Sequence, residues 1–333
     1  MGGPREANVG IIVTGSIATD YLAVFPGRFV EQILPDQLDN LSVSFLVEDL
    51  AIHRGGAAAN IAFNLGCLGL APALVGAVGA DFAEYGQWLS EHGVDISAVA
   101  VSQTKHTARF LCTTDSDQNQ IASFYAGAMS ESRDIELKPI VDRLGGTGLV
   151  VIGPSDPAAM QRHTQECREQ GYPFAADPSQ QLAWLGGEEI KQLVDGATYL
   201  FTNSYERGLL EHKTGWAEDD ILARVGVSVM TRGAKGVTVQ RPGEPVISVT
   251  PPQELAKADP TGVGDAFRAG FLAGVHWGVG DERAAQIGCM LATLVIESVG
   301  TQEHDFEPEP FMQRFSEAYG PDSAAEVADH VHA

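Results

Sequence analysis

Continuous apolar runs alternate with helical patterns through most of this sequence. Six runs rich in valine, isoleucine and other apolar residues lie at residues 9–15, 73–79, 149–154, 172–178, 198–203 and 227–233. Between them, apolar positions recur at helical spacing in residues 57–68, 82–92, 158–170, 188–194 and 219–225. Strands that are apolar throughout are buried on both faces, and helices are the connections that a parallel sheet needs. The pattern predicts an α/β fold with a mostly parallel central sheet.

Two segments depart from this alternation because apolar and polar residues take turns along them. They are residues 41–52 and 107–125, and the second has a turn-rich centre, "DSDQNQ". Such alternation is typical of strands with one exposed face, and the second segment predicts a hairpin. We therefore expect a single domain over residues 1–333 with a small, discontinuous β-sheet lid, formed by approximately residues 21–52 and 105–126.

The charge balance excludes two classes of partner. The chain has 333 residues, with 44 acidic and 21 basic side chains and a net charge of −23. Nucleic acids and anionic membrane surfaces are recognised through basic patches, so we expect neither as a partner. An anionic ligand must then be held by a local positive feature, because the overall field repels it.

Nothing in the sequence resembles a targeting or membrane segment. No run approaches the ~18 apolar residues that a membrane helix needs. The four cysteines, Cys67, Cys112, Cys167 and Cys289, form no CxxC pair, which argues against a zinc site or a disulfide framework. We expect buried free thiols and a cytoplasmic location.

The candidate chemistry lies in "DPTGVGDAFRAGF", residues 259–271. The residues after Gly264 are apolar on most faces, so they predict a buried helix. Gly262 and Gly264 let the backbone approach a ligand closely, and the first turn of a helix carries free N–H groups and the positive end of the helix dipole. The backbone of Gly262, Val263 and Gly264 therefore predicts an anion site, and a phosphate is the anion that it suits.

Asp265 complicates this site because a carboxylate repels a bound phosphate. The conflict disappears if the phosphoryl group is transferred, since the carboxylate then takes the proton from the attacking hydroxyl. A second interpretation stays open, in which Asp265 is only the N-cap of the helix, worth ~1 kcal/mol. The motif is neither a Walker loop nor a dinucleotide fingerprint, because it lacks GxxxxGK[ST] and a third glycine.

The stretch "DPTGVGDAF" resembles the signature Asp-Thr-x-Gly-x-Gly-Asp of the ribokinase-like, PfkB-type kinases of sugars and nucleosides. A second signature of that family is matched by "HRGGAAANIA", residues 53–62, and the likeness extends from "VTGSIATD" to "ESVGTQE". Pro260 is a small departure that leaves the two glycines and the aspartate in place. The resemblance implies a three-layer α/β/α ribokinase-like fold with a small β-sheet lid. Within the family the chain is most similar to actinobacterial adenosine kinases, which implies transfer of the γ-phosphoryl group of ATP to the 5′-hydroxyl of adenosine in purine salvage.

The residues expected to hold the acceptor begin with Asp20, which follows the first strand. Ligands of α/β proteins bind at the carboxyl edge of the sheet, and a carboxylate there accepts hydrogen bonds from two ribose hydroxyls. Gly55 and Gly56 permit a close approach of the backbone to the same sugar, and Asn60 offers both a donor and an acceptor. The resemblance adds two weaker substrate contacts, Ser16 and Ser44.

Phe110 and Phe124 lie on the two strands of the predicted hairpin. For an isolated phenylalanine, packing in a core is the better explanation, but the resemblance favours a role in which the two rings sandwich a flat base. Gln180 and Gln181 follow a strand that ends in Asp177, and their amides suit purine edges or a ribose hydroxyl.

The donor half of the site is expected after the next two strands. Asn203 and Glu206 match an Asn-x-x-Glu motif with which the family organises Mg²⁺ and phosphate, chiefly through water, and Mg²⁺ keeps several waters in proteins. The turn "TRGAKG" matches the family's nucleotide-binding turn, and its residues are Thr231, Arg232, Gly233, Ala234, Lys235 and Gly236. Arg232 and Lys235 alternatively are solvated turn residues. The resemblance also implies a monovalent cation such as K⁺ near residues 297–301 and a homodimer through the lid sheet.

Two other functions stay open. The same chemistry acting on a free sugar such as ribose or fructose would make Phe110 and Phe124 part of the lid core. A non-catalytic regulator that binds a nucleoside or nucleotide would keep the pocket, but it has no need of a base beside the anion site.

Overall fold

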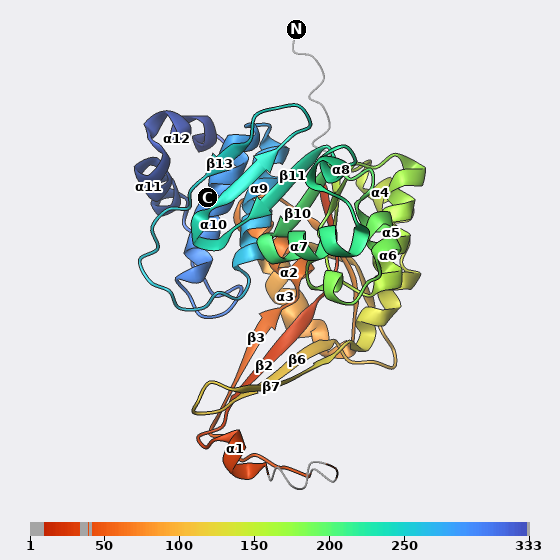
Figure 1. Ribbon diagram of the computed structural model, residues 1–333, viewed down its shortest axis with the longest axis vertical. Helices are drawn as coiled ribbons and strands as arrows, with labels where there is room; N and C mark the ends of the chain where they lie inside the picture. The colour runs from red at the N-terminus through yellow and green to blue at the C-terminus, as the bar shows by residue number, and fades with distance from the viewer. Residues whose placement is uncertain (1–9, 34–38, 40–41, 332–333) are drawn as a thin grey trace.

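A nine-stranded sheet forms the centre of the computed structural model, which describes residues 10–33, 39 and 42–331 (Figure 1). In spatial order its strands are β13 (Ile247–Val249), β12 (Val237–Gln240), β11 (Val227–Thr231), β10 (Tyr199–Asn203), β9 (Phe174–Ala176), β8 (Leu149–Ile152), β1 (Ile11–Thr14), β4 (Ala73–Val78) and β5 (Asp95–Val101). The strands from β11 to β5 pair in parallel, and β12 and β13 extend one edge in antiparallel pairing. The predicted mostly parallel sheet is confirmed.

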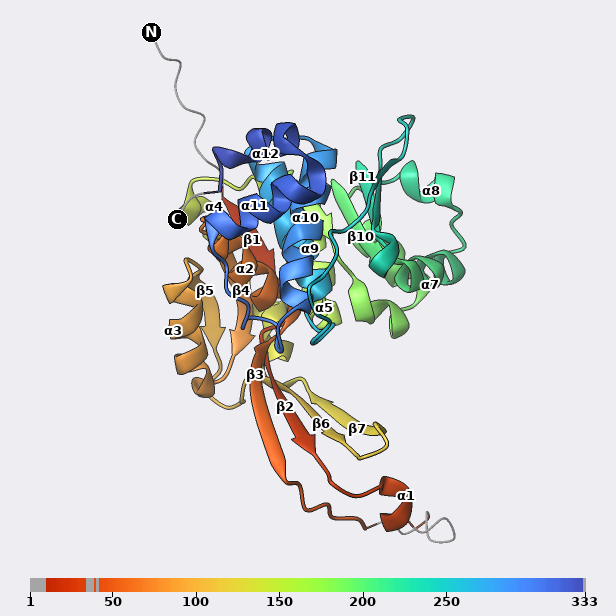
Figure 2. The same cartoon turned by 90° about the vertical axis from the view of Figure 1, so that its left-hand side faces the viewer.

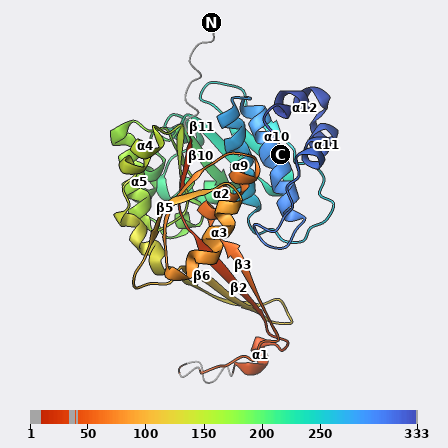
Figure 3. The same ribbon diagram turned by 180° about the vertical axis from the view of Figure 1, so that it is seen from behind.

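Helices cover both faces of this sheet, and Figure 3 shows α4 and α5 on the side opposite to α10, α11 and α12. One layer contains α2 (Ala57–Cys67), α3 (Ala83–Glu91), α9 (Val263–Trp277), α10 (Asp281–Ile296), α11 (Pro308–Tyr319) and α12 (Pro321–Ala328). The other contains α4 (Lys138–Leu144), α5 (Pro157–Gln170), α6 (Gly187–Val194), α7 (Ser204–Thr214) and α8 (Glu218–Leu222). Successive strand residues serve both layers: Val13 packs into the first core and Ile12 into the second. The strands are apolar throughout for this reason.

A smaller sheet projects from the body of the molecule (Figure 2). Its strands, in spatial order, are β3 (Asp49–Gly55), β2 (Ala18–Val24), β6 (Ala108–Thr114) and β7 (Gln120–Tyr125). The antiparallel pair of β6 and β7 confirms the predicted hairpin. The short helix α1 (Phe29–Gln32) lies at the far end of this sheet. We call the four strands the lid.

The predicted strand over residues 41–52 is wrong in its first part. Residue 41 lies outside the described residues, and β3 begins only at Asp49, after an irregular stretch. Phe45 packs there against Phe25 and Phe29, with ring centroids 5.1 and 4.8 Å apart. The apolar periodicity of this stretch therefore reflects an aromatic cluster beyond the sheet, and only the end of the segment forms a strand.

All four cysteines are free, and three of them are buried, in agreement with the sequence. Within residues 10–33, 39 and 42–331, no helix combines the length and the apolar character that crossing a membrane requires.

Candidate active site

The carboxyl ends of β11, β10, β9 and β1 carry polar residues that the sequence singled out. β10 ends at Asn203, which pairs directly with Thr231 at the end of β11. Asp177 follows β9 directly, and Ser16 lies two residues beyond β1. The lid begins four residues after the end of β1, so it stands at the same edge of the sheet. This edge is where α/β folds bind ligands.

The amino terminus of α9 provides an anion site at this edge. Gly262 is the N-cap, with a φ of 76°, and a Cβ on it would lie 2.9 Å from the side chain of Thr301. Glycine is therefore required there by both conformation and space. Val263, Gly264 and Asp265 form the first turn of α9, where backbone N–H groups have no partner within the helix. The predicted cradle thus exists as a backbone geometry, and its role in binding phosphate remains a prediction.

Asp265 lies at the third position of α9, not at its N-cap. Its side chain makes no capping hydrogen bond; instead its Oδ2 accepts a hydrogen bond of 2.8 Å from Asn60 Nδ2. The interpretation of Asp265 as an N-cap is therefore wrong. Burial raises the pKa of Asp265, while Arg268 and the hydrogen bond from Asn60 oppose that rise. A carboxylate with a raised pKa beside an anion site has the properties of a general base.

Arg268, one turn further along α9, is the buried cation of the site. Its guanidinium pairs with Asp177 at 2.5 Å and lies 3.9 Å from Glu206. It also donates to the carbonyl of Gly264 over 3.0 Å. Arg268 is the one charged residue in the apolar stretch 266–275, and no role for it was predicted from the sequence. The structure shows that it joins α9 to Asp177 after β9 and to the first turn of α7.

Asp20 lies on the lid face that carries Phe110 and Phe124. One row across the lid pairs His53 with Asp20, Asp20 with Phe110, and Phe110 with Phe124. A Cβ on Gly55 would fall 2.8 Å from Asp20 Oδ2, so the carboxylate lies against this glycine. Burial raises the pKa of Asp20 to about 6, with Asp259 and Asp265 adding to the rise and His53 opposing it.

The expected sandwich of Phe110 and Phe124 is wrong. The two residues are direct cross-strand partners, so their side chains extend from the same face of the lid. Phe124 is 52% exposed and Phe110 is half-buried. The two rings therefore form one wall beside Asp20, and a flat ligand would have both on the same side.

The weaker acceptor candidates have other contacts. Ser16 Oγ accepts a hydrogen bond of 3.0 Å from the Ala57 N–H at the start of α2, directly after Gly56, its N-cap. Gln181 Nε2 donates to the Ser155 carbonyl over 2.8 Å. Gln180 is exposed beside it, and Ser44 is exposed in the irregular stretch before β3. Substrate contacts of these residues stay predictions.

The donor candidates lie at the ends of β10 and β11. Asn203 caps α7: its Oδ1 accepts from the Glu206 N–H over 2.8 Å, and Glu206 Oε2 accepts from the Asn203 N–H over 2.7 Å. This reciprocal capping box explains the Asn-x-x-Glu spacing on structural grounds alone, so its role toward a nucleotide stays a prediction. Arg232 and Lys235 are exposed in the connection between β11 and β12, and Gly236 has a φ of 85°.

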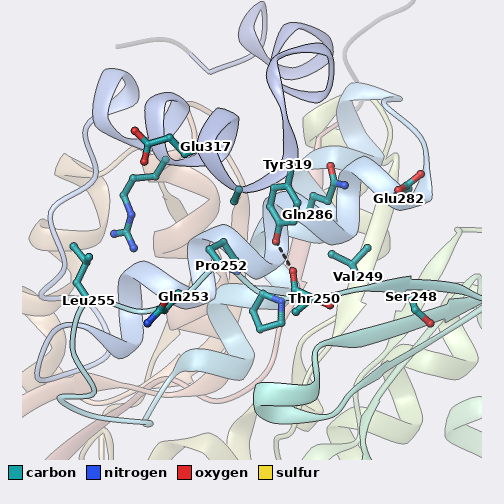
Figure 4. A pocket seen from close by; sticks show the side chains of 13 residues that line it. Ser248, Val249, Thr250, Pro252, Gln253, Leu255, Glu282, Gln286, Glu317 and Tyr319 are labelled. Carbon is teal, nitrogen blue, oxygen red and sulfur yellow. Dashed lines mark hydrogen bonds between the residues drawn. The ribbon is translucent and has the colours of Figure 1, made fainter.

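A hollow of about 540 Å³ lies between the segment Ser248–Leu255, α10 and α11 (Figure 4). The Tyr319 hydroxyl donates to the carbonyl of Thr250 across it, over 3.0 Å. Its lining residues include none of the candidates named from the sequence. This hollow is therefore separate from the polar edge described above.

Comparisons with known proteins bear on the whole chain. The model of the pfkB family carbohydrate kinases matches residues 23–308. A nucleoside kinase from Methanothermobacter thermautotrophicus is 29% identical over 304 residues, which cover 90% of this chain and 97% of that protein. The structure of a Burkholderia thailandensis nucleoside kinase in complex with inosine has a TM-score of 0.82 and 34% identity, over 93% of this chain and 98% of that one. The same kinase in complex with ADP-inosine gives a TM-score of 0.80 and 35% identity, over 93% and 96%.

These similarities extend over both sheets and both helical layers. The family that the two glycine-rich motifs indicated is therefore confirmed. The chain belongs to the PfkB family of carbohydrate kinases, has the ribokinase-like fold and is a phosphotransferase that acts on a hydroxyl group.

Proposed function

We propose that this protein is an ATP-dependent kinase of purine nucleosides, with adenosine as its acceptor in purine salvage. The observation that carries the proposal is the position of Asp265, one residue beyond Val263 and Gly264 in the first turn of α9. A base and an anion site on one helical turn are the two components that phosphoryl transfer to a hydroxyl needs. The nucleoside kinases of similar sequence and structure support this acceptor class.

In the proposed reaction, the ribose lies against Asp20 and Gly55 with its 5′-hydroxyl toward Asp265. The O–H bond breaks as the oxygen attacks the γ-phosphorus, and the proton passes to the Asp265 carboxylate. The backbone N–H groups of the first turn of α9 stabilise the charge on the phosphoryl group. The bond from the γ-phosphorus to its bridging oxygen breaks, giving AMP and ADP. The wall of Phe110 and Phe124 offers a surface for the base.

Mg²⁺ would neutralise the phosphates of the donor. Among the described residues, no group of three or more histidine, cysteine or acidic side chains could hold a metal ion. Glu206 supplies one carboxylate, of which Oε2 is engaged by the Asn203 N–H. That donor set fits an ion that arrives with the nucleotide and keeps its waters. We assign Asn203, Glu206 and the turn from Thr231 to Gly236 to the donor side.

A monovalent cation near residues 297–301 would depend on backbone carbonyls. The Glu297 carboxylate already pairs with Arg314 at 2.7 Å and accepts from the Leu255 N–H over 2.7 Å. Potassium dependence of the rate therefore stays a prediction, which replacement of K⁺ by a large organic cation tests.

A homodimer through the lid is part of the proposal. The lid face opposite to Asp20 exposes apolar side chains: Leu50 at 52%, Ile52 at 58%, Leu111 at 41% and Ile121 at 45%. A contiguous apolar face of this kind is typical of an interface. Sedimentation of the protein and of Ile52→Lys tests it, and a monomeric wild type contradicts it.

Consumption of ATP across a panel of acceptors tests the proposed function. We expect adenosine to be phosphorylated far more efficiently than ribose or fructose, with inosine and guanosine showing how far the base matters. Faster turnover of a free sugar would favour the sugar kinase. Nucleoside binding without turnover of any acceptor would favour the regulator.

A further inference from the structure

A chain of buried side-chain hydrogen bonds leads from the acceptor end of the site to Asp265. Tyr85 Oη donates to the carbonyl of Gly55 over 2.9 Å, and Gln302 Nε2 donates to Tyr85 Oη over 2.6 Å. The same Nε2 donates to Asn60 Oδ1 over 2.9 Å, and Asn60 Nδ2 donates to Asp265 Oδ2 over 2.8 Å. Tyr85, Asn60 and Gln302 are 5%, 4% and 1% exposed. Bulk water therefore has no access to replace these bonds.

The two ends of the chain fix the direction of every bond in it. A backbone carbonyl only accepts, so Tyr85 donates to Gly55 and offers oxygen lone pairs to Gln302. Gln302 then turns its NH₂ group toward Tyr85 and uses the second hydrogen for Asn60. Asn60 accepts at Oδ1 and has its own NH₂ group for Asp265, whose carboxylate only accepts when ionised.

One buried atom of the chain has no hydrogen-bond partner in the part of the protein that the structure describes, which shows that the other bonds fix the orientation of the Gln302 amide. Gln302 Oε1 is buried and has no hydrogen-bond partner among the described residues. Turning the Gln302 amide over would give Oε1 the Tyr85 hydroxyl, but it would leave the Gly55 carbonyl without its donor. It would also bring Oε1 next to Asn60 Oδ1, where two oxygen atoms repel each other. If Asn60 turned over as well, its oxygen would face the Asp265 carboxylate. Buried polar atoms are rarely left unpaired without such a reason.

We propose that Tyr85 and Gln302 are positioning residues that act on Asp265 through Asn60. The proposal rests on the role of Asp265 as the base in the proposed function. By holding the NH₂ group of Asn60 toward Oδ2, they stabilise the ionised carboxylate and leave Oδ1 to take the proton of the acceptor hydroxyl. Thr301 Oγ1 lies 2.9 Å from Asn60 Oδ1 and 2.7 Å from the carbonyl of Arg54, so its single hydrogen serves one of the two and does not fix the amide.

The test is the pH dependence of kcat, whose acid limb reports the pKa of the base in the complex, where the nucleoside already occupies Asp20. In Gln302→Glu a carboxylate replaces the donor, so Asn60 turns its NH₂ group toward residue 302 and its oxygen toward Asp265. We expect the acid limb to move upward by at least about one pH unit, because Asp265 loses one charge-assisted hydrogen bond and gains a neighbouring negative charge. Tyr85→Phe removes only the hydroxyl that links Gln302 to the Gly55 carbonyl, and we expect the acid limb to move upward by about half a pH unit.

Tyr319→Phe is the matched control, because it also removes a hydroxyl that donates to a backbone carbonyl, that of Thr250, over 3.0 Å. We expect its acid limb to coincide with that of the wild type. Melting temperatures show whether each variant is folded; Tyr85→Phe keeps the ring and decides the question if Gln302→Glu does not fold. Folded, active variants with unmoved acid limbs overturn the positioning role and leave the proposed function intact. A wild type that phosphorylates no acceptor, or shows no acid limb, overturns the base assignment and this proposal with it.

Discussion

Replacing Asp20 by asparagine should stabilise the unliganded protein while it weakens nucleoside binding. Burial raises the pKa of Asp20 from its ordinary value of 3.8 to about 6, so the folded protein disfavours the ionised carboxylate. The difference of about 2 units corresponds to about 3 kcal/mol at 1.36 kcal/mol per unit. Since the side chain is partly exposed, solvent screens some of this energy, and we expect a gain of about 1–3 kcal/mol.

Because the pKa of Asp20 is raised in the folded protein, the stability gain of the variant depends on pH. Below pH 3.8 both the folded and the unfolded chain hold the proton, so the ionisation of Asp20 costs nothing. The cost grows as the unfolded chain releases its proton first, and it is complete above a pH of about 6. Asparagine does not ionise. The stability gain of the variant should therefore be near zero at about pH 4 and largest at pH 7–8.

Urea unfolding of both proteins from pH 4 to pH 8 measures the gain, and calorimetry with adenosine measures the binding. At pH 8 we expect adenosine affinity to fall roughly 10- to 150-fold, because ribose hydroxyls lose a charged partner worth ~1.5–3 kcal/mol. Asp49→Asn, an exposed acid at the outer end of the same lid, is the control and should show neither effect. A gain that does not vary with pH, or a loss of stability at pH 8, would refute this reasoning.

Three further substitutions test separate parts of the site. Asp265→Asn should lower the rate ~10²–10⁴-fold in single-turnover assays while adenosine binding measured by calorimetry stays intact; a loss within threefold would exclude the base. Phe124→Ala should weaken adenosine binding at least about tenfold, because a stacked ring contributes ~1–3 kcal/mol, whereas unchanged affinity would remove the phenylalanine wall from the binding site. Arg268→Met leaves Asp177 and Glu206 without their buried cation and should lower the free energy of unfolding by ~3–5 kcal/mol in urea; a loss below about 1 kcal/mol would show that the cluster contributes little.

The central sheet could be predicted because its strands have one property that is visible in sequence. Ile12 and Val13 pack into opposite cores, so no polar residue interrupts the run. The same criterion missed β12 and β13, the last two strands on one side of the sheet, because both are short and carry no continuous apolar run. It overextended the strand near residue 45, because Phe45 repeats the alternation while packing on Phe25 and Phe29. Periodicity records burial, and it does not record which element buries the residue.

The candidate site also has parts that could be predicted from the sequence and parts that could not. The helix start at Gly262 with Asp265 in its first turn could be predicted because it is local in sequence. The arrangement of Phe110 and Phe124 could not, because it depends on a strand register that places both on one face. Tyr85 and Gln302 are 217 positions apart. Their meeting follows from the packing of α3 against the chain after α10, and no short motif contains it.

The charges around the site separate the acceptor from the donor. Asp20 lies near Asp259 and Asp265, and both raise its pKa. Burial disfavours the ionised form of Asp259, but hydrogen bonds from Thr261 and Gly300 lower its pKa overall, so it stays ionised. Three carboxylates around one place repel an acceptor that already carries phosphate, whereas the hydroxyls of a neutral nucleoside donate to them. The triphosphate of the donor needs groups that offset these carboxylates, and in our proposal the backbone N–H groups of the first turn of α9 with Arg232 and Lys235 supply them. The distribution of charge thus favours a neutral nucleoside over a nucleotide or a sugar phosphate as the group that approaches Asp265.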